Sequence, residues 1–166
     1  PASAGAVITA GNVELGVRDE GNLGFPYDGS IIRRGFAGVG LALGNNPAYG
    51  PGLIGDAITP GCLCEGWGVA TSDDEGLPFP GFPNAGESGY ANVAVDGVTN
   101  LVVDSFTSTA TTAVSTVHLA SLPDLVVTQN YHAAYIDGMG GALFRDTVTI
   151  ENTGTTTLSD IRYRRV

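Results

Sequence analysis

Lysine is absent from this sequence of 166 residues, and its seven lysine-or-arginine positions are all arginine. Seventeen acidic residues give a net charge of −10, and the isoelectric point is near 4.3. Such a surface repels phosphate backbones and anionic lipid, so we expect no nucleic-acid partner. No apolar run approaches the roughly 20 residues of a membrane-spanning helix, so we expect no membrane span.

Catalytic signatures are also missing. The sequence has no GxSxG, no HExxH, no P-loop and no GxGxxG between a strand and a helix. The two histidines, His118 and His132, fall in separate expected strands, and we expect His118 to face outward. His132, beside Tyr131, is the better functional candidate, but a structural role fits it better. We therefore expect a protein that is not an enzyme and needs no cofactor.

Helical periodicity is the third absence, because Gly, Pro, Thr and Val interrupt nearly every window. Short segments of alternating polarity, separated by turn residues, are frequent instead. They predict an all-β fold, an antiparallel β-sandwich or jelly roll with little or no helix. The length suits one domain, 1–166, which we interpret as the N-terminal part of a longer natural chain.

Alternation and turn chemistry place the expected strands along the chain. They are Val13–Val17, Val39–Leu43, Trp67–Val69, Tyr90–Val95, Leu101–Thr107, Thr112–Leu119, Leu125–Tyr131, Leu143–Ile150 and Leu158–Val166. The segments 45–61 and 73–89 are rich in Gly and Pro and are predicted to be long loops.

The C-terminal region has the clearest pattern. Phe144, Val148 and Ile150 share one face of their strand, and Asn152 to Gly154 supplies turn chemistry, so we predict a terminal hairpin. Its second strand leaves an open edge that needs another partner. This predicted assembly edge consists of Ile161, Arg162, Tyr163, Arg164, Arg165 and Val166. Ile161 and Tyr163 are expected on its apolar face, and Arg162 and Arg164 on the other.

Cys62 and Cys64 are separated by one residue. Such a pair can form a small strained disulfide, bind a soft metal jointly, pair with other chains or remain as buried thiols. In an exported chain we favour the disulfide.

Asp73, Asp74 and Glu75 form an acidic turn. We interpret it as a solvated loop, with Ca²⁺ binding as the alternative, because the alternating acidic spacing of a calcium loop is missing.

Aromatic side chains offer one further kind of site. Trp67, together with Tyr27, Tyr49 and Tyr90, could stack on sugar rings, which would make polysaccharide a partner. The competing interpretation of a single tryptophan beside a cystine is core packing, and for Trp67 we favour it.

Four stretches carry a resemblance: GVRDEGNLG, GCLCEGWGVA, FTSTATTAVSTVHLASLPDLVVTQNY and LFRDTVTIENTGTTTLSDIRYRRV. Together they resemble a group of uncharacterised bacterial exported proteins, many of which carry a C-terminal anchor or sorting segment. In that group the last strand continues into an acidic and aromatic segment. The resemblance implies secretion or a cell-surface location, and the start at Pro1 is interpreted as a mature end left by signal removal.

Three functional hypotheses follow. The first is a secreted structural protein of an extracellular matrix, surface layer or filament, which self-associates by completing a neighbour's sheet. The second is a carbohydrate-binding or carbohydrate-active β-sandwich. The third is an adhesion module stabilised by Ca²⁺.

Overall fold

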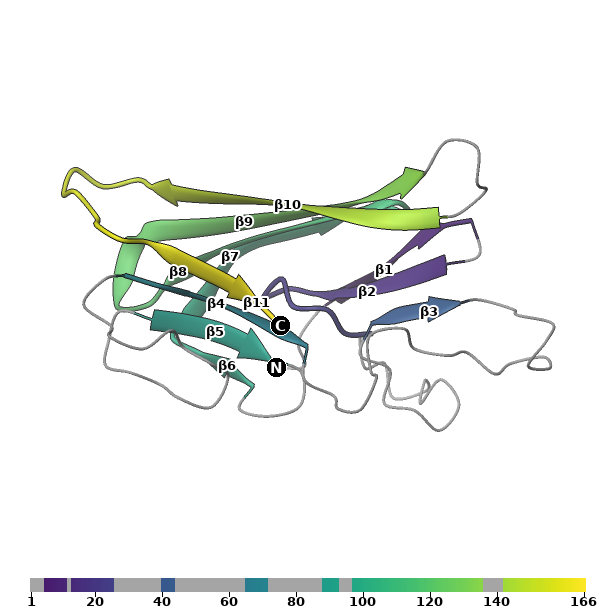
Figure 1. Cartoon of the computed structure of the whole chain (residues 1–166), viewed down its shortest axis with the longest axis horizontal. Coiled ribbons are helices and arrows are strands. Elements are labelled where there is room, and N and C mark those ends of the chain that lie inside the picture. The colour runs from purple at the N-terminus through teal and green to yellow at the C-terminus, as the bar shows by residue number, and fades with distance from the viewer. Residues whose placement is uncertain are drawn as a thin grey trace.

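The structure is a computed structural model, and it describes residues 5–11, 13–25, 40–43, 65–71, 88–92, 97–135 and 142–166. Within these ranges every regular element is a β-strand. Figure 1 shows the strands packed as layers in a sandwich-like arrangement. The predicted all-β fold is confirmed.

The strands in chain order are β1 (Gly5–Ala10), β2 (Val13–Arg18), β3 (Leu41–Leu43), β4 (Gly66–Ala70), β5 (Ser88–Asn92), β6 (Val98–Thr99), β7 (Leu101–Ser108), β8 (Thr112–Leu119), β9 (Leu122–Tyr135), β10 (Ala142–Asn152) and β11 (Arg162–Arg165). They form three sheets, with strand orders β1-β2-β3, β10-β9-β8-β7 and β11-β4-β5-β6. All strand pairs are antiparallel.

The sheet β10-β9-β8-β7 is the long layer of the sandwich. The two smaller sheets pack against the same side of it, one under each half, as Figure 1 shows. Strand β8 shows why this layer has one buried face. Its residues alternate strictly between half-buried and buried, with Ala113, Ser115, Val117 and Leu119 facing inward. A period of two follows from the pleat, which turns successive side chains to opposite faces.

Two apolar clusters fill the space between the layers. The Trp67 core lies between the long sheet and β4-β5, and consists of Trp67, Val69, Ala91, Val117, Leu119, Leu125 and Val127. The Tyr131 core lies between the other half of the long sheet and β1-β2, and consists of Ile8, Leu15, Val17, Ala113 and Tyr131. Strands β8 and β9 contribute to both cores and so connect them.

Two local predictions are confirmed. Strands β7 and β8 pair as the expected Ser/Thr-rich hairpin. On β10, Val148 and Ile150 pack against the Trp67 core, and Phe144 packs against the Tyr131 core. These three side chains and Asp146 on the same face are half-buried, while Arg145, Thr147 and Thr149 are exposed.

The predicted terminal hairpin is wrong. Strand β10 pairs with β9, whereas β11 pairs with β4 in a different sheet. The turn after β10 explains the difference: Thr153 N–H still donates to Asp124 O at 2.9 Å, and Asn152 Nδ2 donates to Thr156 O at 2.7 Å. The chain therefore follows β9 past the end of β10 and then crosses to the facing layer. As expected, the last strand has a neighbour that is not adjacent in sequence.

Candidate functional site

Strand β11 brings an arginine into the interior. Its alternation places Ile161 and Tyr163 against the Trp67 core, and Arg165 follows on the same face. The Tyr163 ring stacks on the Trp67 indole, with centroids 5.8 Å apart and 24° between the planes. Backbone bonds between Gly66 and Val166 extend the pairing with β4 at its end. The residues on either side of Arg165 in the chain are therefore both anchored to β4: Tyr163 by its ring and Val166 by its backbone.

The Arg165 guanidinium lies among two acids and two polar side chains of β9. Its Nη2 donates to Glu65 Oε1 at 2.6 Å, and its Nη1 lies 3.3 Å from Asp146 Oδ2. The same Nη1 lies 2.8 Å from Gln129 Oε1 and 2.5 Å from the Tyr131 hydroxyl. We call these five residues the Arg165 cluster. It joins β11, β9, β10 and the segment before β4, so it fixes both layers relative to each other.

The turn after β2, residues 19–23, contacts the Arg165 cluster, and we call the cluster and this turn together the junction. Three side chains from different strands donate to its carbonyl groups: Ser115 Oγ to Asp19, Trp67 Nε1 to Glu20 and Tyr131 Oη to Gly21, at 2.5, 2.9 and 2.7 Å. In return, Leu23 N–H donates to Glu65 Oε2 at 2.6 Å. Buried backbone groups need such partners, and here they come from the long sheet and from β4.

Gly21 is required within this turn. Its φ of +82° lies in the left-handed region, where residues with a Cβ are strained. A Cβ at this position would also stand 2.9 Å from Gln129 Nε2. The absence of a side chain at Gly21 therefore also makes room for Gln129 of the Arg165 cluster.

In this cluster Arg165 forms ion pairs with two carboxylates, those of Glu65 and Asp146. Burial raises the pKa of Glu65 to about 7, and the charge of Arg165 offsets that increase only in part. Burial likewise raises the pKa of Asp146 above its ordinary value, again against the lowering effect of Arg165. Burial by itself would lower the pKa of Arg165, but the surrounding Tyr131 and Glu65 outweigh it and raise that pKa. The arginine therefore stays charged, and Glu65 is the acid whose protonation changes near neutrality.

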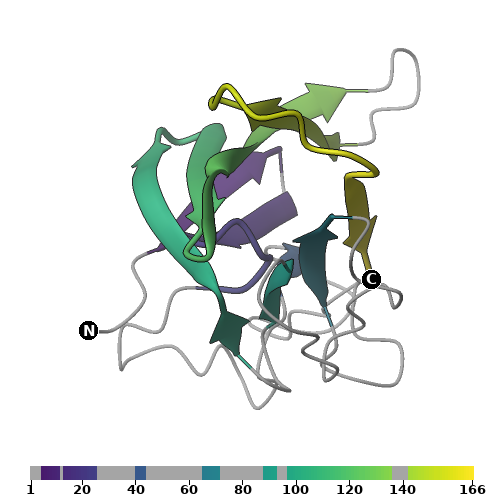
Figure 2. The same ribbon diagram turned by 90° about the vertical axis from the view of Figure 1, so that its left-hand side faces the viewer.

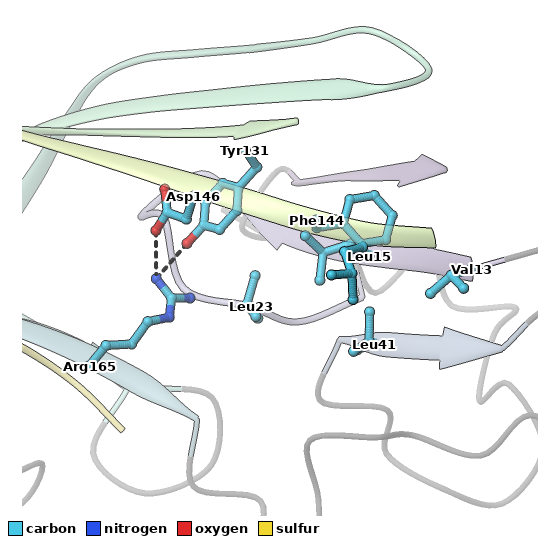
Figure 3. A pocket seen from close by; sticks show the side chains of 9 residues that line it. Val13, Leu15, Leu23, Leu41, Tyr131, Phe144, Asp146 and Arg165 are labelled. Carbon is cyan, nitrogen blue, oxygen red and sulfur yellow. Dashed lines mark hydrogen bonds and ion pairs between the residues drawn. The ribbon is translucent and has the colours of Figure 1, made fainter. Parts of the chain in front are cut away.

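A cavity of about 240 Å³ opens beside the cluster. Figure 3 shows Tyr131, Asp146 and Arg165 pointing toward one another at one end. The rest of the lining is apolar: Val13, Leu15, Leu23, Leu41, Leu143 and Phe144. Glu65 does not line this cavity. Its raised pKa therefore belongs to the buried ion pair and does not mark an acid exposed to a substrate.

The predicted sugar-stacking residues are buried where the structure describes them. Trp67 is 1% exposed and Tyr90 is 3% exposed, so neither ring offers a platform for a sugar. For Trp67 the favoured interpretation, core packing, holds. Tyr27 and Tyr49 lie outside the described residues, as do the predicted disulfide residues Cys62 and Cys64.

The predicted calcium loop of Asp73, Asp74 and Glu75 also lies outside the described residues. In the described part of the chain, no group of three or more His, Cys, Asp or Glu side chains is arranged to hold a metal ion. The same part contains no helix of the length and apolarity needed to cross a membrane.

Within the predicted assembly edge, Ile161 and Tyr163 point inward and Arg162 and Arg164 are exposed, as expected. Arg165 also points inward, and Val166 is exposed. Arg165 shares the face of Tyr163 because it is two residues further along a strand.

The two histidines lie on the outer face of the long sheet. His118 Nδ1 is 2.8 Å from Asp104 Oδ1, which supports the expectation that His118 faces outward. His132 alternates with the buried Tyr131 and pairs in register with Thr112 and Arg145. His132 acts on the Arg165 cluster through its charge, which lowers the pKa of Asp146.

The Arg165 cluster was not predicted, although a local sequence pattern indicates that Arg165 is buried. The parity that places Ile161 and Tyr163 inside also places Arg165 inside, and a buried arginine needs acids. Nothing in the sequence selects Glu65 and Asp146 among seventeen acidic residues.

Comparison with known proteins adds no identity. No family model matches the chain, and neither a curated protein nor a solved structure gives a significant match.

Proposed function

We propose that this protein is a structural subunit of a bacterial extracellular or cell-surface assembly, in which subunits associate through an exposed sheet edge. The observation that supports this proposal most directly is the position of strand β10 at the edge of its sheet. The strand has 11 residues and forms the outer edge of the long sheet. An edge strand presents unpaired N–H and C=O groups, which another chain can complete by β-augmentation. The resemblance to exported proteins supports the location.

The opposite edge of the same sheet is less suited to pairing. Strand β7 is irregular between Val103 and Ser105, where a bulge-like register shift occurs at Asp104. Bulges and charges are devices that prevent edge pairing. By contrast, β10 pairs with β9 over all its residues without a register shift. A regular, uninterrupted edge is therefore found on the β10 side.

Strand β11 lies on that same side of the molecule. Its Arg165 reaches Asp146 of β10, and the view in Figure 2 shows both strands along one flank of the sandwich. Because β11 already pairs with β4, we propose β10 as the main assembly edge and β11 as a flanking strand. Removing Arg162–Val166 would also remove Arg165 and so tests stability as well as assembly.

The test uses Val148, whose backbone N–H points to the open edge, as argued below. Val148→Pro removes that donor, whereas the control Val148→Ala shortens the side chain but keeps the N–H. Sedimentation velocity across a range of concentrations should show self-association for wild type and Val148→Ala, and monomers for Val148→Pro. Circular dichroism checks that each variant is folded.

Two results would refute the proposal: a wild-type chain that stays monomeric at every concentration, or a folded Val148→Pro variant that assembles like wild type. If Val148→Pro does not fold, the double variant Thr147→Lys/Thr149→Lys replaces it. Both threonines are exposed on β10, and lysines along an edge strand oppose pairing. Thr107→Lys on β7 is the matched control, and it should assemble normally.

A further inference from the structure

The register and orientation of the assembly contact follow from which backbone groups of β10 are unpaired. Thr153 N–H donates to Asp124 O, in continuation of the ladder in which Asn152 is opposite Leu125. In an antiparallel pair, successive residues bond alternately toward one neighbour and the other. The odd-numbered residues of β10 therefore bond β9, and the even-numbered residues direct their N–H and C=O groups outward.

A second bond confirms this parity from the other side of β9. Ala133 N–H donates to Thr111 O, so the odd-numbered residues of β9 bond β8 and its even-numbered residues bond β10. The partners of even-numbered β9 residues on β10 are odd-numbered, as in the pair of His132 with Arg145. Both ends of the ladder thus assign the outward bonds of β10 to its even-numbered residues, from 142 to 152.

We infer that β10 pairs with β10 of a second copy of this chain, antiparallel and about a two-fold axis that passes at Val148. This inference rests on the proposed assembly through β10 and specifies the partner and register. In this register Val148 faces its own counterpart, and Asp146 is opposite Ile150. Both of these pairs join even-numbered residues, so the outward bonds of the two strands meet, about ten in all if pairing runs from 144 to 152.

Charge complementarity selects this register. On the exposed outer face, Arg145 lies opposite Glu151 of the second copy, and the two-fold axis repeats that pair. Thr147 lies opposite Thr149 between them. These are the non-hydrogen-bonded positions of the ladder, where side chains from opposite strands come closest. A shift by two residues in pairing would place Arg145 opposite Thr149 or beyond the end of the strand and would lose both charge pairs.

The contact also leaves the buried site intact. Asp146 keeps its interaction with Arg165 on the inner face, because pairing at the edge uses only backbone groups there. The two long sheets then form one continuous sheet across the axis. A two-fold contact of this kind closes at two copies, so a longer assembly needs a second, different contact.

The test reverses the charges. Arg145→Glu and Glu151→Arg each place like charges opposite each other at both ends of the contact, which should weaken dimerisation by about tenfold at low salt. The double variant Arg145→Glu/Glu151→Arg should dimerise within about threefold of wild type. Mixing the two single variants should restore dimers, because each heterodimer then contains two Glu–Arg pairs. All four proteins keep a negative net charge, so general attraction does not explain such a rescue.

Sedimentation velocity with one single variant fluorescently labelled measures the mixed dimer directly. Impaired single variants that are rescued by mixing support the register. Single variants that dimerise like wild type, or that mixing and the double swap fail to rescue, overturn it. If that happens while Val148→Pro still abolishes assembly, the edge is correct and only the register is wrong. If Val148→Pro also assembles normally, the proposed function fails as well.

Discussion

The Trp67 core and the Tyr131 core lie under the same sheet but are closed differently. The Trp67 core is bounded by two four-stranded sheets and contains an aromatic stack with Tyr163. The Tyr131 core is bounded on one side by a sheet whose third strand has only three residues, and a cavity of about 240 Å³ adjoins it. Apolar and aromatic packing fills the first core, with one polar contact from Trp67 Nε1 to Glu20 O, while the second core has the Arg165 cluster at its boundary.

Those polar contacts lie where the two small sheets meet. The Arg165 cluster and the turn at 19–23 connect the last strand, the long sheet and the β2 end in one network. Buried networks of this kind are strongly destabilised when one member is removed, because the remaining groups lose their partners. The comparison therefore predicts that the Trp67 core responds to lost volume, and the junction responds to lost charge and to pH.

The largest loss of stability should appear when a leucine is shortened in the enclosed core, and the same substitution in the other core should cost less. Leu119→Ala in the Trp67 core should lower the free energy of unfolding by about 4 kcal/mol, because a fully enclosed space is left empty. Leu15→Ala in the Tyr131 core should cost about 2.5 kcal/mol, since Leu15 already borders the cavity and its neighbours can relax into it. Urea unfolding of both variants measures the difference. Equal losses would contradict the proposed contrast.

Removing the central charge should have the next largest effect. Arg165→Met keeps most of the side-chain length but leaves Glu65 and Asp146 buried without their cation, at a cost of about 3 kcal/mol. Arg162→Met is the matched control. Arg162 is exposed and lies 3.7 Å from Asp160, so its loss should change stability by less than about 0.5 kcal/mol in a urea titration. A similar cost at both positions would show that Arg165 does not organise the junction.

Stability should fall as pH rises through the range set by Glu65. The folded chain holds the proton of Glu65 up to about pH 7, whereas the unfolded chain releases it near the ordinary value of 4.5. The folded state therefore binds more protons, and the free energy of unfolding decreases with pH between these values, by on the order of 2–3 kcal/mol. The raised pKa of Asp146 acts in the same direction.

Glu65→Gln isolates this contribution. The amide cannot ionise but retains an oxygen that can accept the Leu23 N–H bond. The difference between wild-type and Glu65→Gln unfolding free energies should therefore change between pH 4.5 and 7 and stay constant above that range. Parallel curves over the whole range would show that Glu65 has the same pKa in the folded and the unfolded chain.

The sequence predicted those features of the fold that depend on neighbours along the chain. The β7–β8 hairpin and the buried face of β10 follow from a period of two and from local turn residues. Strand β1 was missed because its small residues were interpreted only as a processed N-terminus. The terminal hairpin was mispredicted because the Asn152–Gly154 turn fits either a tight reversal or a crossing between layers.

The candidate site depends on contacts between distant residues, which no local pattern specifies. Glu65 and Arg165 are 100 positions apart, and the turn at Gly21 is 110 positions from Tyr131. The alternation of side chains along β11 predicts that Arg165 is buried. Its acidic partners, Glu65 and Asp146, are determined by the crossing of β11 to β4, which the sequence does not show. Trp67 is a similar case. The sequence allows its indole to be either a sugar platform or a core residue, and its burial between the layers shows that it is a core residue.

The smallest expected effects are on β10, which contributes side chains to both cores from one face. Val148→Asp places an acid against the Trp67 core and should cost about 2 kcal/mol, less than a fully buried position because Val148 is half-buried. Thr149→Asp, on the exposed face, should change stability by less than about 0.5 kcal/mol. Thermal and urea unfolding should be measured at low protein concentration, so that loss of assembly does not add to the change. Large losses at both positions would show that both faces of β10 are covered, contrary to the exposure of Thr149.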